Sequence, residues 1–148
     1  MTSPDLDNLA VSVTFQVKLD DQDLGSFSGC EGLGCEVVIE THEEGGNNGY
    51  AWQLPTKLRY PNIKLTRPLT RDSEKIVKWL TSMQTGYTRR TGTIVAMRAD
   101  GKVIATWGLL DVVPVRWSGP ALAADDSRVL TESVEIAHHG FIASSGGV

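Results

Sequence analysis

Histidines and cysteines are the side chains of this sequence best suited to hold a metal ion or to act as nucleophiles. The histidines are His42, His138 and His139, and the cysteines are Cys30 and Cys35. His138 and His139 are adjacent on an expected strand, so they point to opposite faces and do not reach one metal ion directly. The spacing of the cysteines matches no zinc motif, and no second pair completes four ligands. We therefore predict no metal and no cofactor, and interpret the cysteines as small, partly buried thiols.

Serine, glycine and carboxylate patterns give equally weak support for catalysis. The Gly25–Gly29 segment has a spacing that differs from the Gly-x-Ser-x-Gly nucleophile elbow. The glycines of the Gly29–Gly34 segment precede neither a basic residue nor a helix, which a phosphate-binding loop requires. Glu43 and Glu44 lie in a glycine-rich loop, where neighbouring carboxylates are normally solvated. These patterns predict that the protein is not an enzyme, and a hydrolase is the least favoured function.

Length and composition indicate a single domain. The chain has 148 residues, of which 41% are hydrophobic, and a net charge of -4. This acidic total argues against recognition of nucleic acid or of an anionic membrane surface, because both need a basic face. No stretch approaches the ~20 apolar residues that span a bilayer. The Met1–Asp7 segment lacks the regions of a secretory signal, so we expect synthesis and assembly in the cytoplasm.

Alternation of apolar and polar residues predicts a mainly β chain. Val13, Phe15, Val17 and Leu19 share one face of a first strand, which is the period of two typical of a strand. Pro55 is expected to end a strand, and Pro114 to require an edge position or a bulge. Further strands are predicted over residues 24–28, 35–42, 50–54, 62–67, 93–98, 103–107, 112–117 and 129–138.

One helix is predicted between the strands. Ile76, Trp79, Leu80 and Met83 recur at helical spacing and form one apolar stripe that we expect to pack on a sheet. Asp72 or Ser73 is expected to cap the N-terminus of this helix, and Gly86 to stop it. The whole pattern favours an antiparallel β-sandwich or barrel with one packed helix. We expect one domain over residues 1–148, with an N-terminal arm over 1–10 and a flexible tail over 142–148.

The strands on either side of the Glu43–Gly49 loop are predicted to form an extended hairpin. Val37, Ile39 and Thr41 share one face of its first strand, and both faces are partly apolar. Long edge strands invite pairing with another chain unless something covers them. Two interpretations stay open at this point: a ring of subunits that share one closed barrel, or an ordinary sandwich with a projecting hairpin.

Several motifs occur in a characteristic order along nearly the whole chain. They are Phe15–Asp20, Phe27–Leu33, Glu43–Gly46, Leu54–Ile63, Pro114–Pro120 with Trp107 and Asp111, and Glu132–Phe141. Together they resemble the tail tube proteins of contractile phage tails and of phage-tail-like injection systems. Thr56, Pro68 and His139 depart from the residues common in that family.

The resemblance implies a structural protein that forms hexameric rings, with strands that extend into one ring-wide β-barrel around a lumen. The rings stack into a tube inside a contractile sheath, which drives the tube and its cargo through a target envelope. Implied partners are the sheath protein, baseplate and spike proteins, tube initiators and cargo in the lumen, without membrane insertion by the subunit. The particle is released or docks at a membrane.

The same resemblance assigns contacts with the neighbouring ring or subunit to the loop residues Glu43, Glu44, Gly45, Gly46, Asn47 and Asn48. A type VI secretion tube and a non-contractile tail tube share this architecture and stay open as alternatives. A monomeric β-sandwich that binds a ligand in a pocket is the alternative from another class of protein.

Overall fold

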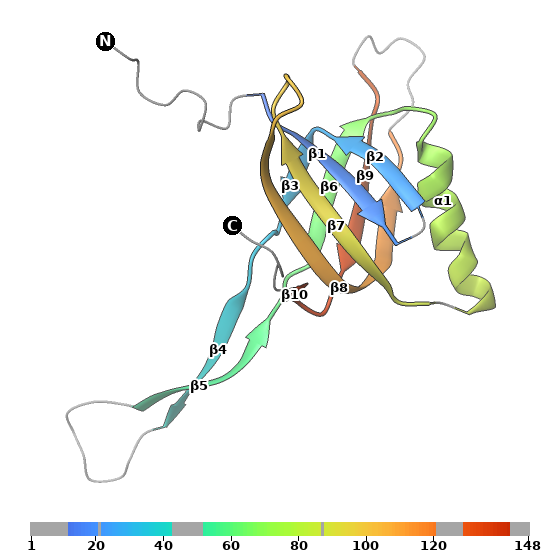
Figure 1. The fold of residues 1–148 in the computed structure, drawn as a ribbon. Coiled ribbons are helices and arrows are strands. Elements are labelled where there is room, and N and C mark those ends of the chain that lie inside the picture. The colour runs from blue at the N-terminus through green and yellow to red at the C-terminus, as the bar shows by residue number, and fades with distance from the viewer. Residues whose placement is uncertain (1–11, 21, 43–51, 87, 121–128, 143–148) are drawn as a thin grey trace, which may run out of the picture.

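A computed structural model of the chain describes residues 12–20, 22–42, 52–86, 88–120 and 129–142 (Figure 1). The described residues form ten strands, one α-helix and a short 3-10 turn over Met83–Thr85. The first six strands are β1 (Thr14–Leu19), β2 (Gln22–Phe27), β3 (Gly29–Glu31), β4 (Glu36–His42), β5 (Trp52–Arg59) and β6 (Ile63–Pro68). They are followed by α1 (Ser73–Ser82), β7 (Arg90–Met97), β8 (Val103–Ser118), β9 (Thr131–Ala137) and β10 (Phe141–Ile142).

All strand pairs are antiparallel, and the main sheet runs in the order β2-β1-β7-β8-β9-β6-β3. β2 and β3 follow each other in sequence but lie at opposite ends of this path, so the sheet curves around its core. Between them, the Ser28 amide donates a hydrogen bond to the Thr66 carbonyl at 2.9 Å. The predicted mainly β, antiparallel fold with one helix is confirmed, and the ring-wide barrel stays a prediction.

β8 is a single strand of 16 residues, whereas the sequence predicted two separate strands here. Its first part pairs with β7 and its last part, from Val113, pairs with β9. The strand bends without ending because Asp111 adopts a φ of 53° and the register shifts between Pro114 and Arg116. A bulge of this kind accommodates the missing N–H of proline, so the prediction of a bulge at Pro114 is confirmed.

The prediction that Pro55 ends its strand is wrong, because β5 continues through Pro55 to Arg59. Each strand of a two-stranded hairpin has one free edge, where the absent N–H of a proline costs no ladder hydrogen bond. The sequence also gave no signal for the short strands β3 and β10. Ile142, the first residue of the expected tail, pairs with Gly108 of β8.

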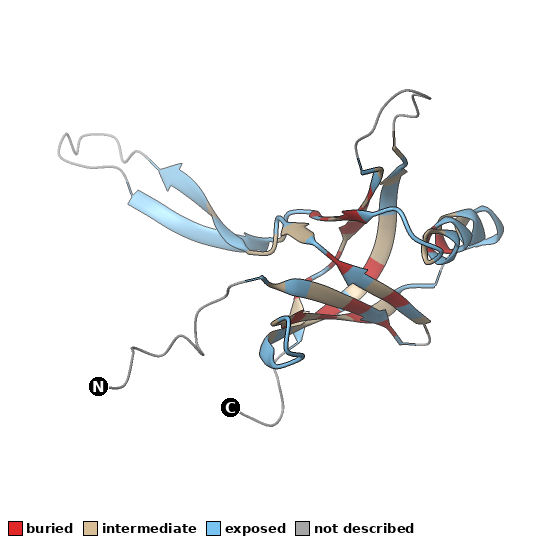
Figure 2. Cartoon of the chain, turned by 90° about the horizontal axis from the view of Figure 1, so that it is seen from above, coloured by how far each residue is buried: buried red, intermediate tan, exposed pale blue. Residues whose placement is uncertain are grey.

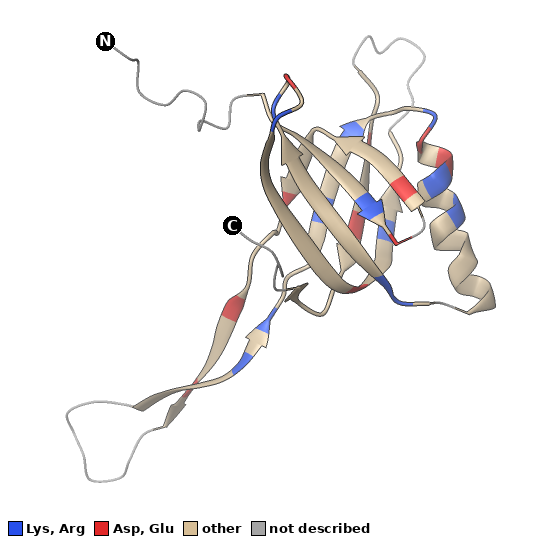
Figure 3. Cartoon of the chain, viewed as in Figure 1, with Lys and Arg blue, Asp and Glu red and all other residues tan. Residues whose placement is uncertain are grey.

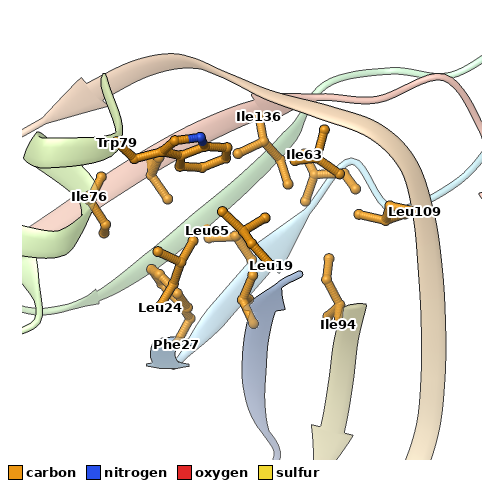
Figure 4. Packing of buried hydrophobic residues seen from close by; sticks show 13 residues of the cluster. Leu19, Leu24, Phe27, Ile63, Leu65, Ile76, Trp79, Ile94, Leu109 and Ile136 are labelled. Atoms are coloured by element: carbon orange, nitrogen blue, oxygen red, sulfur yellow. The ribbon is translucent and has the colours of Figure 1, made fainter. Parts of the chain in front are cut away.

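The helix packs its apolar stripe on the core, on the side of the fold away from β4 and β5 (Figures 1 and 2). Ile76 and Trp79 are buried and point into a cluster with residues such as Leu65 and Ile136 (Figure 4). Leu80 and Met83 are half-buried and pack against the same cluster, with Met83 in the 3-10 turn after the helix.

The start of the helix differs from the prediction that a side chain caps it. Asp72 occupies the N-cap position without a capping hydrogen bond. Its carboxylate lies 3.3 Å from Lys75 Nζ instead, while Ser73 Oγ donates to the Thr70 carbonyl at 2.8 Å. Gly86 ends the 3-10 turn with a φ of 110°, which favours glycine. Within the described residues, none of the helical structure has the length and apolar character needed to cross a membrane.

Candidate assembly surface

β4 and β5 form a separate two-stranded sheet that stands clear of the main sheet (Figures 1 and 2). Every residue of β5 is exposed, and so is every residue of β4 except Val38. A two-stranded hairpin has little stability of its own in water unless another layer covers one of its faces. This projecting hairpin is therefore the first candidate for a surface that another chain covers.

One face of the hairpin is apolar. Val37 lies opposite Leu58, and Ile39 lies opposite Pro55, so these four side chains share one side of the ribbon. The exposed fractions of Val37, Ile39 and Leu58 are 48%, 51% and 54%. We call Val37, Ile39, Pro55 and Leu58 the apolar face of the hairpin. The sequence predicted Val37 and Ile39 on a shared face, but not their partners on β5.

The register places the charged residues of β4 and β5, which are coloured in Figure 3, on the other face of the hairpin. Arg59 Nη1 lies 3.1 Å from Glu36 Oε1, and His42 Nε2 lies 3.6 Å from Glu40 Oε2. This polar face also holds Val38, Trp52, Leu54 and Lys57. The polar face thus mixes the Glu36–Arg59 ion pair with apolar residues, whereas the apolar face carries no charged residue.

A bulge places Pro55 and Leu58 on the same side of β5. The register shifts between Val38 and Ile39, which leaves Thr56 as the extra residue of β5. Thr56 Oγ1 donates to the Val38 carbonyl at 2.9 Å, so the irregular ladder retains a hydrogen bond at this point. Without this extra residue, Leu58 and Pro55 would point to opposite faces.

Three aromatic rings pack at the root of the hairpin, where β5 joins the main sheet. The ring centroid of Tyr60 lies 5.4 Å from that of His138 and 5.8 Å from that of Phe141, and the last two are 5.3 Å apart. Gly140 has a φ of 128° and runs directly beneath the Tyr60 ring. At the same level, a side chain at Gly32 would overlap the carbonyl oxygen of Asn62. The root is therefore closely packed.

His138 is buried within this aromatic cluster. Its Nδ1 accepts a hydrogen bond from the Gly140 amide at 3.2 Å, while its Nε2 is buried without a partner among the described residues. Burial lowers the pKa of His138, the Gly140 backbone opposes this shift, and the neighbouring His139 adds to it. The neutral imidazole is thus the form that fits the root.

Several edges of the main sheet have no partner strand in the described part of the chain, among them the outer edges of β2 and β3 and part of one edge of β8. β2 pairs with β1 on one side only. β8 pairs with β7 along its first part, and on its other edge it meets β10 at Gly108 and Leu109. The Val103–Trp107 stretch of that edge is left without a strand. Unpaired edges with free N–H and C=O groups are templates for another strand.

The outer face of the four strands β2, β1, β7 and β8 carries polar residues together with two apolar ones. Lys18 lies between Asp23 of β2 and Thr93 of β7. Val95 and Met97 of β7 lie opposite Gln16 and Thr14 of β1 on the same face. The sheet therefore presents hydroxyl and amide groups, two apolar side chains, and one lysine beside one aspartate.

On the helix side there is an open groove of about 480 Å³, lined by Leu69, Ser73, Glu74, Val77, Lys78, Trp117 and Pro120. The residues available in the described ranges form no group of three potential metal ligands. Cys30 is half-buried, and its thiol pKa is raised by burial and then by Glu31. Cys35 is exposed, so the expectation of partial burial is wrong for Cys35, which directly precedes the projecting strand β4.

The loop residues that the sequence assigned to contacts between rings lie outside the described residues. Glu43, Glu44, Gly45, Gly46, Asn47 and Asn48 belong to the connection between β4 and β5. The structure brings together the two strands that lead to this loop.

Solved structures with the same fold come from contractile injection particles. A chain of the anti-feeding prophage baseplate is 20% identical, with a TM-score of 0.74 and 96% of each chain covered. A chain of the sheath-tube complex of the extracellular contractile injection system PVC, in its extended state, is 18% identical with a TM-score of 0.75, covering 95% of this chain and 97% of that one. Hcp1 from Flavobacterium johnsoniae is 14% identical with a TM-score of 0.50, covering 84% and 89%.

A comparison with curated protein sequences gave no match. A family model does match most of the chain: residues 11–142 fit the model of the T4-like virus tail tube protein gp19. This range includes the main sheet, the helix and the projecting hairpin. The chain therefore belongs to the T4-like virus tail tube protein gp19 family, and it is a structural subunit of an inner tube.

Proposed function

We propose that this chain forms hexameric rings that stack into a hollow tube inside a contractile sheath, which delivers cargo through a target envelope. The observation that carries the proposal is the four-stranded sheet β2-β1-β7-β8, which has an unpaired edge on β2 and another along Val103–Trp107 of β8. In a ring, the β2 edge of one copy pairs with the β8 edge of the next. Closure of the ring then removes both free edges.

The outer face of this sheet lines the lumen in the proposed ring. Hydroxyl and amide groups share this face with the apolar Val95 and Met97, and Lys18 is paired in register with Asp23. Such a wall has little net charge, so it neither repels nor traps a charged cargo strongly. α1 lies on the side away from the lumen, where the sheath surrounds the tube.

The hairpin makes the contact with the next ring. It stands clear of its own main sheet (Figure 2), and its loop residues Glu43–Asn48 reach the neighbouring subunits. The subunit is a structural component and catalyses no reaction. Its partners are the sheath protein, baseplate and spike proteins and a tube initiator, and it acts within a released or membrane-docked particle.

A tube of the gp19 type is favoured over a type VI secretion tube. The TM-scores with the anti-feeding prophage baseplate and PVC sheath-tube chains are 0.74 and 0.75, against 0.50, 0.51, 0.54 and 0.57 with three Hcp proteins and a type six secretion system protein. The alignments with the larger TM-scores extend over the projecting hairpin as well as the sheet, since they cover 96% and 95% of this chain.

Negative-stain electron microscopy tests the proposal directly. The purified protein is examined alone and after co-expression with sheath and baseplate proteins. Stacked rings or hollow tubes are expected, because the two sheet edges and the hairpin then find their partners. A protein that stays monomeric even with these partners present would overturn the proposal in favour of a ligand-binding β-sandwich.

A further inference from the structure

We propose that the apolar face of the hairpin docks on Val103 and Ile104 at the far end of a second copy of this chain in the next ring. The inference rests on the proposed stacking and adds the two surfaces that meet. Val103 and Ile104 open β8, directly after the β7–β8 turn. The contact joins two different surfaces, so each copy offers one to the copy above and the other to the copy below.

The apolar face needs a partner that its own chain does not supply. Val37, Ile39 and Leu58 are each about half exposed, although they lie in the middle of a regular ladder. The opposite face carries the Glu36–Arg59 ion pair, which suits contact with water. A two-stranded ribbon gains stability when its uncharged aliphatic face is covered, since burial removes aliphatic surface from water.

The receiving surface lies at the opposite end of the same sheet. Leu109 of β8 pairs with Phe141, and the Phe141 ring packs on Tyr60 at the hairpin root. Val103 precedes Leu109 by six positions on the same strand, which places it about 20 Å from the root at 3.3 Å per residue. Figure 1 shows the β7–β8 turn at the end of the fold away from the hairpin.

Head-to-tail contacts between two such ends do not close on themselves. A surface at one end that binds a different surface at the other end repeats without limit, as an open stack requires. A second copy of this chain is therefore the partner that fits both ends. Because the chain belongs to a tail tube family, many copies of that partner are present wherever the protein assembles.

Val103 and Ile104 are exposed to 55% and 38%. Met97 pairs with Val103 and Ala96 pairs with Ala105, so Ile104 is the extra residue of a bulge beside the turn. The ion pair between Arg98 and Asp100, at 3.3 Å, borders this corner. An aliphatic centre with a charged rim is the usual build of a protein interface.

Several other exposed aliphatic residues lie away from the far end of the sheet. Leu69 and Val77 line the groove beside the helix. The Leu110 amide donates to the Gly140 carbonyl at 2.9 Å, so Leu110 lies at the same end as the hairpin root. Val103 and Ile104 are thus adjacent exposed aliphatic residues at the far end, where Val129, 74% exposed, also lies just before β9.

Val103→Lys and Val115→Lys form a matched pair of variants that tests the docking. Both valines are on β8 and similarly exposed, at 55% and 47%, so neither change disturbs the core. Ring pairing along β8 uses backbone groups, so rings are expected from both variants. Val103→Lys is expected to shorten tubes at least tenfold, and Val115→Lys to leave their length unchanged. Tubes of normal length from Val103→Lys would overturn the docking. A failure of Val103→Lys to form rings would overturn it as well, because the docking predicts a defect in stacking alone.

Directed cross-linking gives an independent test. In a Cys30→Ser, Cys35→Ser background, one preparation carries Ile39→Cys and another carries Val103→Cys, and the two are assembled together and oxidised. A disulfide-linked dimer that contains one of each is expected. Glu40→Cys, on the polar face of the same strand, is the control and should give no such dimer. Tubes in which Ile39→Cys fails to link to Val103→Cys would refute this docking while leaving the tube function standing.

The proposed function fails in a different way. If the unmodified protein and both lysine variants give only monomers with all partners present, the tube itself is disproved. If the unmodified protein forms tubes and Val103→Lys does so equally well, only the docking is disproved.

Discussion

Arg67 Nε donates a hydrogen bond to Glu132 Oε1 at 2.7 Å, and the two side chains are 2% and 0% exposed. They are direct partners in the register of β6 and β9. Trp117 of β8 donates to the second carboxylate oxygen of Glu132 at 2.9 Å, and the Arg67 guanidinium lies 4.4 Å from the centre of the Phe27 ring. One buried ion pair thus connects four strands beneath the start of the helix.

This network keeps Glu132 ionised. Burial by itself raises the pKa of a carboxyl group, but the hydrogen bonds from Arg67 and Trp117, together with the charge of Arg67, lower the pKa of Glu132 below its ordinary value. Replacement of one partner leaves the other as a buried charge without compensation, which is far more costly than loss of an exposed pair.

Glu132→Gln is therefore expected to lower the free energy of unfolding by about 3–5 kcal/mol. Glu36→Gln breaks the exposed pair with Arg59 and serves as the control, with an expected loss of at most about 1 kcal/mol. Urea unfolding of the unassembled subunit, followed by tryptophan fluorescence, measures both values. Equal losses in the free energy of unfolding would show that the buried pair contributes no more to stability than the exposed pair.

Acidification is expected to weaken the hairpin root through His138. Because the pKa of His138 is lowered in the fold, the unfolded chain binds a proton more readily than the folded chain. The contribution of His138 to stability is complete above the ordinary histidine pKa of about 6.5 and is lost as the pH falls toward the lower folded value.

Unfolding midpoints measured across this pH interval test the expectation for His138. His138→Phe should flatten the dependence, whereas the exposed His42→Gln should leave it as in the unmodified protein. An unchanged slope in His138→Phe would show that His138 does not cause the dependence of stability on pH.

Trp79→Ala is expected to destabilise the subunit by about 3–5 kcal/mol, because it opens a cavity between α1 and the sheet. Val77→Ala, on the outer side of the same helix with 38% exposure, is the control and should change stability by no more than about 1 kcal/mol. Thermal unfolding measured by circular dichroism compares the two. A small effect of Trp79→Ala would mean that the helix contributes little to the core.

Deletion of Glu44–Asn48 is expected to leave folded subunits that no longer form long tubes. The loop connects the two strands of the hairpin, so a shorter connection removes the proposed contact with the next ring without touching the main sheet. Circular dichroism checks the fold, and electron microscopy measures tube length. Unimpaired tube growth would contradict the assignment of the loop to contacts between rings.

Much of the fold follows from the period of the apolar residues. The alternation of β1 and the helical spacing of Ile76 and Trp79 both place side chains in the core, because burial of a whole face dominates these elements. Irregular backbone was harder to predict. Asp111 and Pro114 interrupt the pattern of β8, yet the strand continues, because its two halves pair with different neighbours.

The candidate site was predictable in part. The hairpin and the shared face of Val37 and Ile39 followed from alternation on β4. The extra residue Thr56 reverses the alternation of β5, so strict alternation would place Pro55 and Leu58 on opposite faces. Their common face was therefore not predictable from the sequence pattern. A break in period next to a proline is the signal that would have suggested a bulge. The Arg67–Glu132 pair joins residues 65 positions apart, and strand register over such a separation is not visible in one sequence.

The continuity of β8 has a mechanical consequence. Its first part pairs with β7 and its last part pairs with β9. A force applied to β7 is therefore transmitted to β9 along the covalent backbone of β8. Side-chain packing between the halves does not have to carry that load. Rupture then requires ladder hydrogen bonds to shear together rather than to open one after another, which makes the subunit a stiff element along the direction of its longest strand.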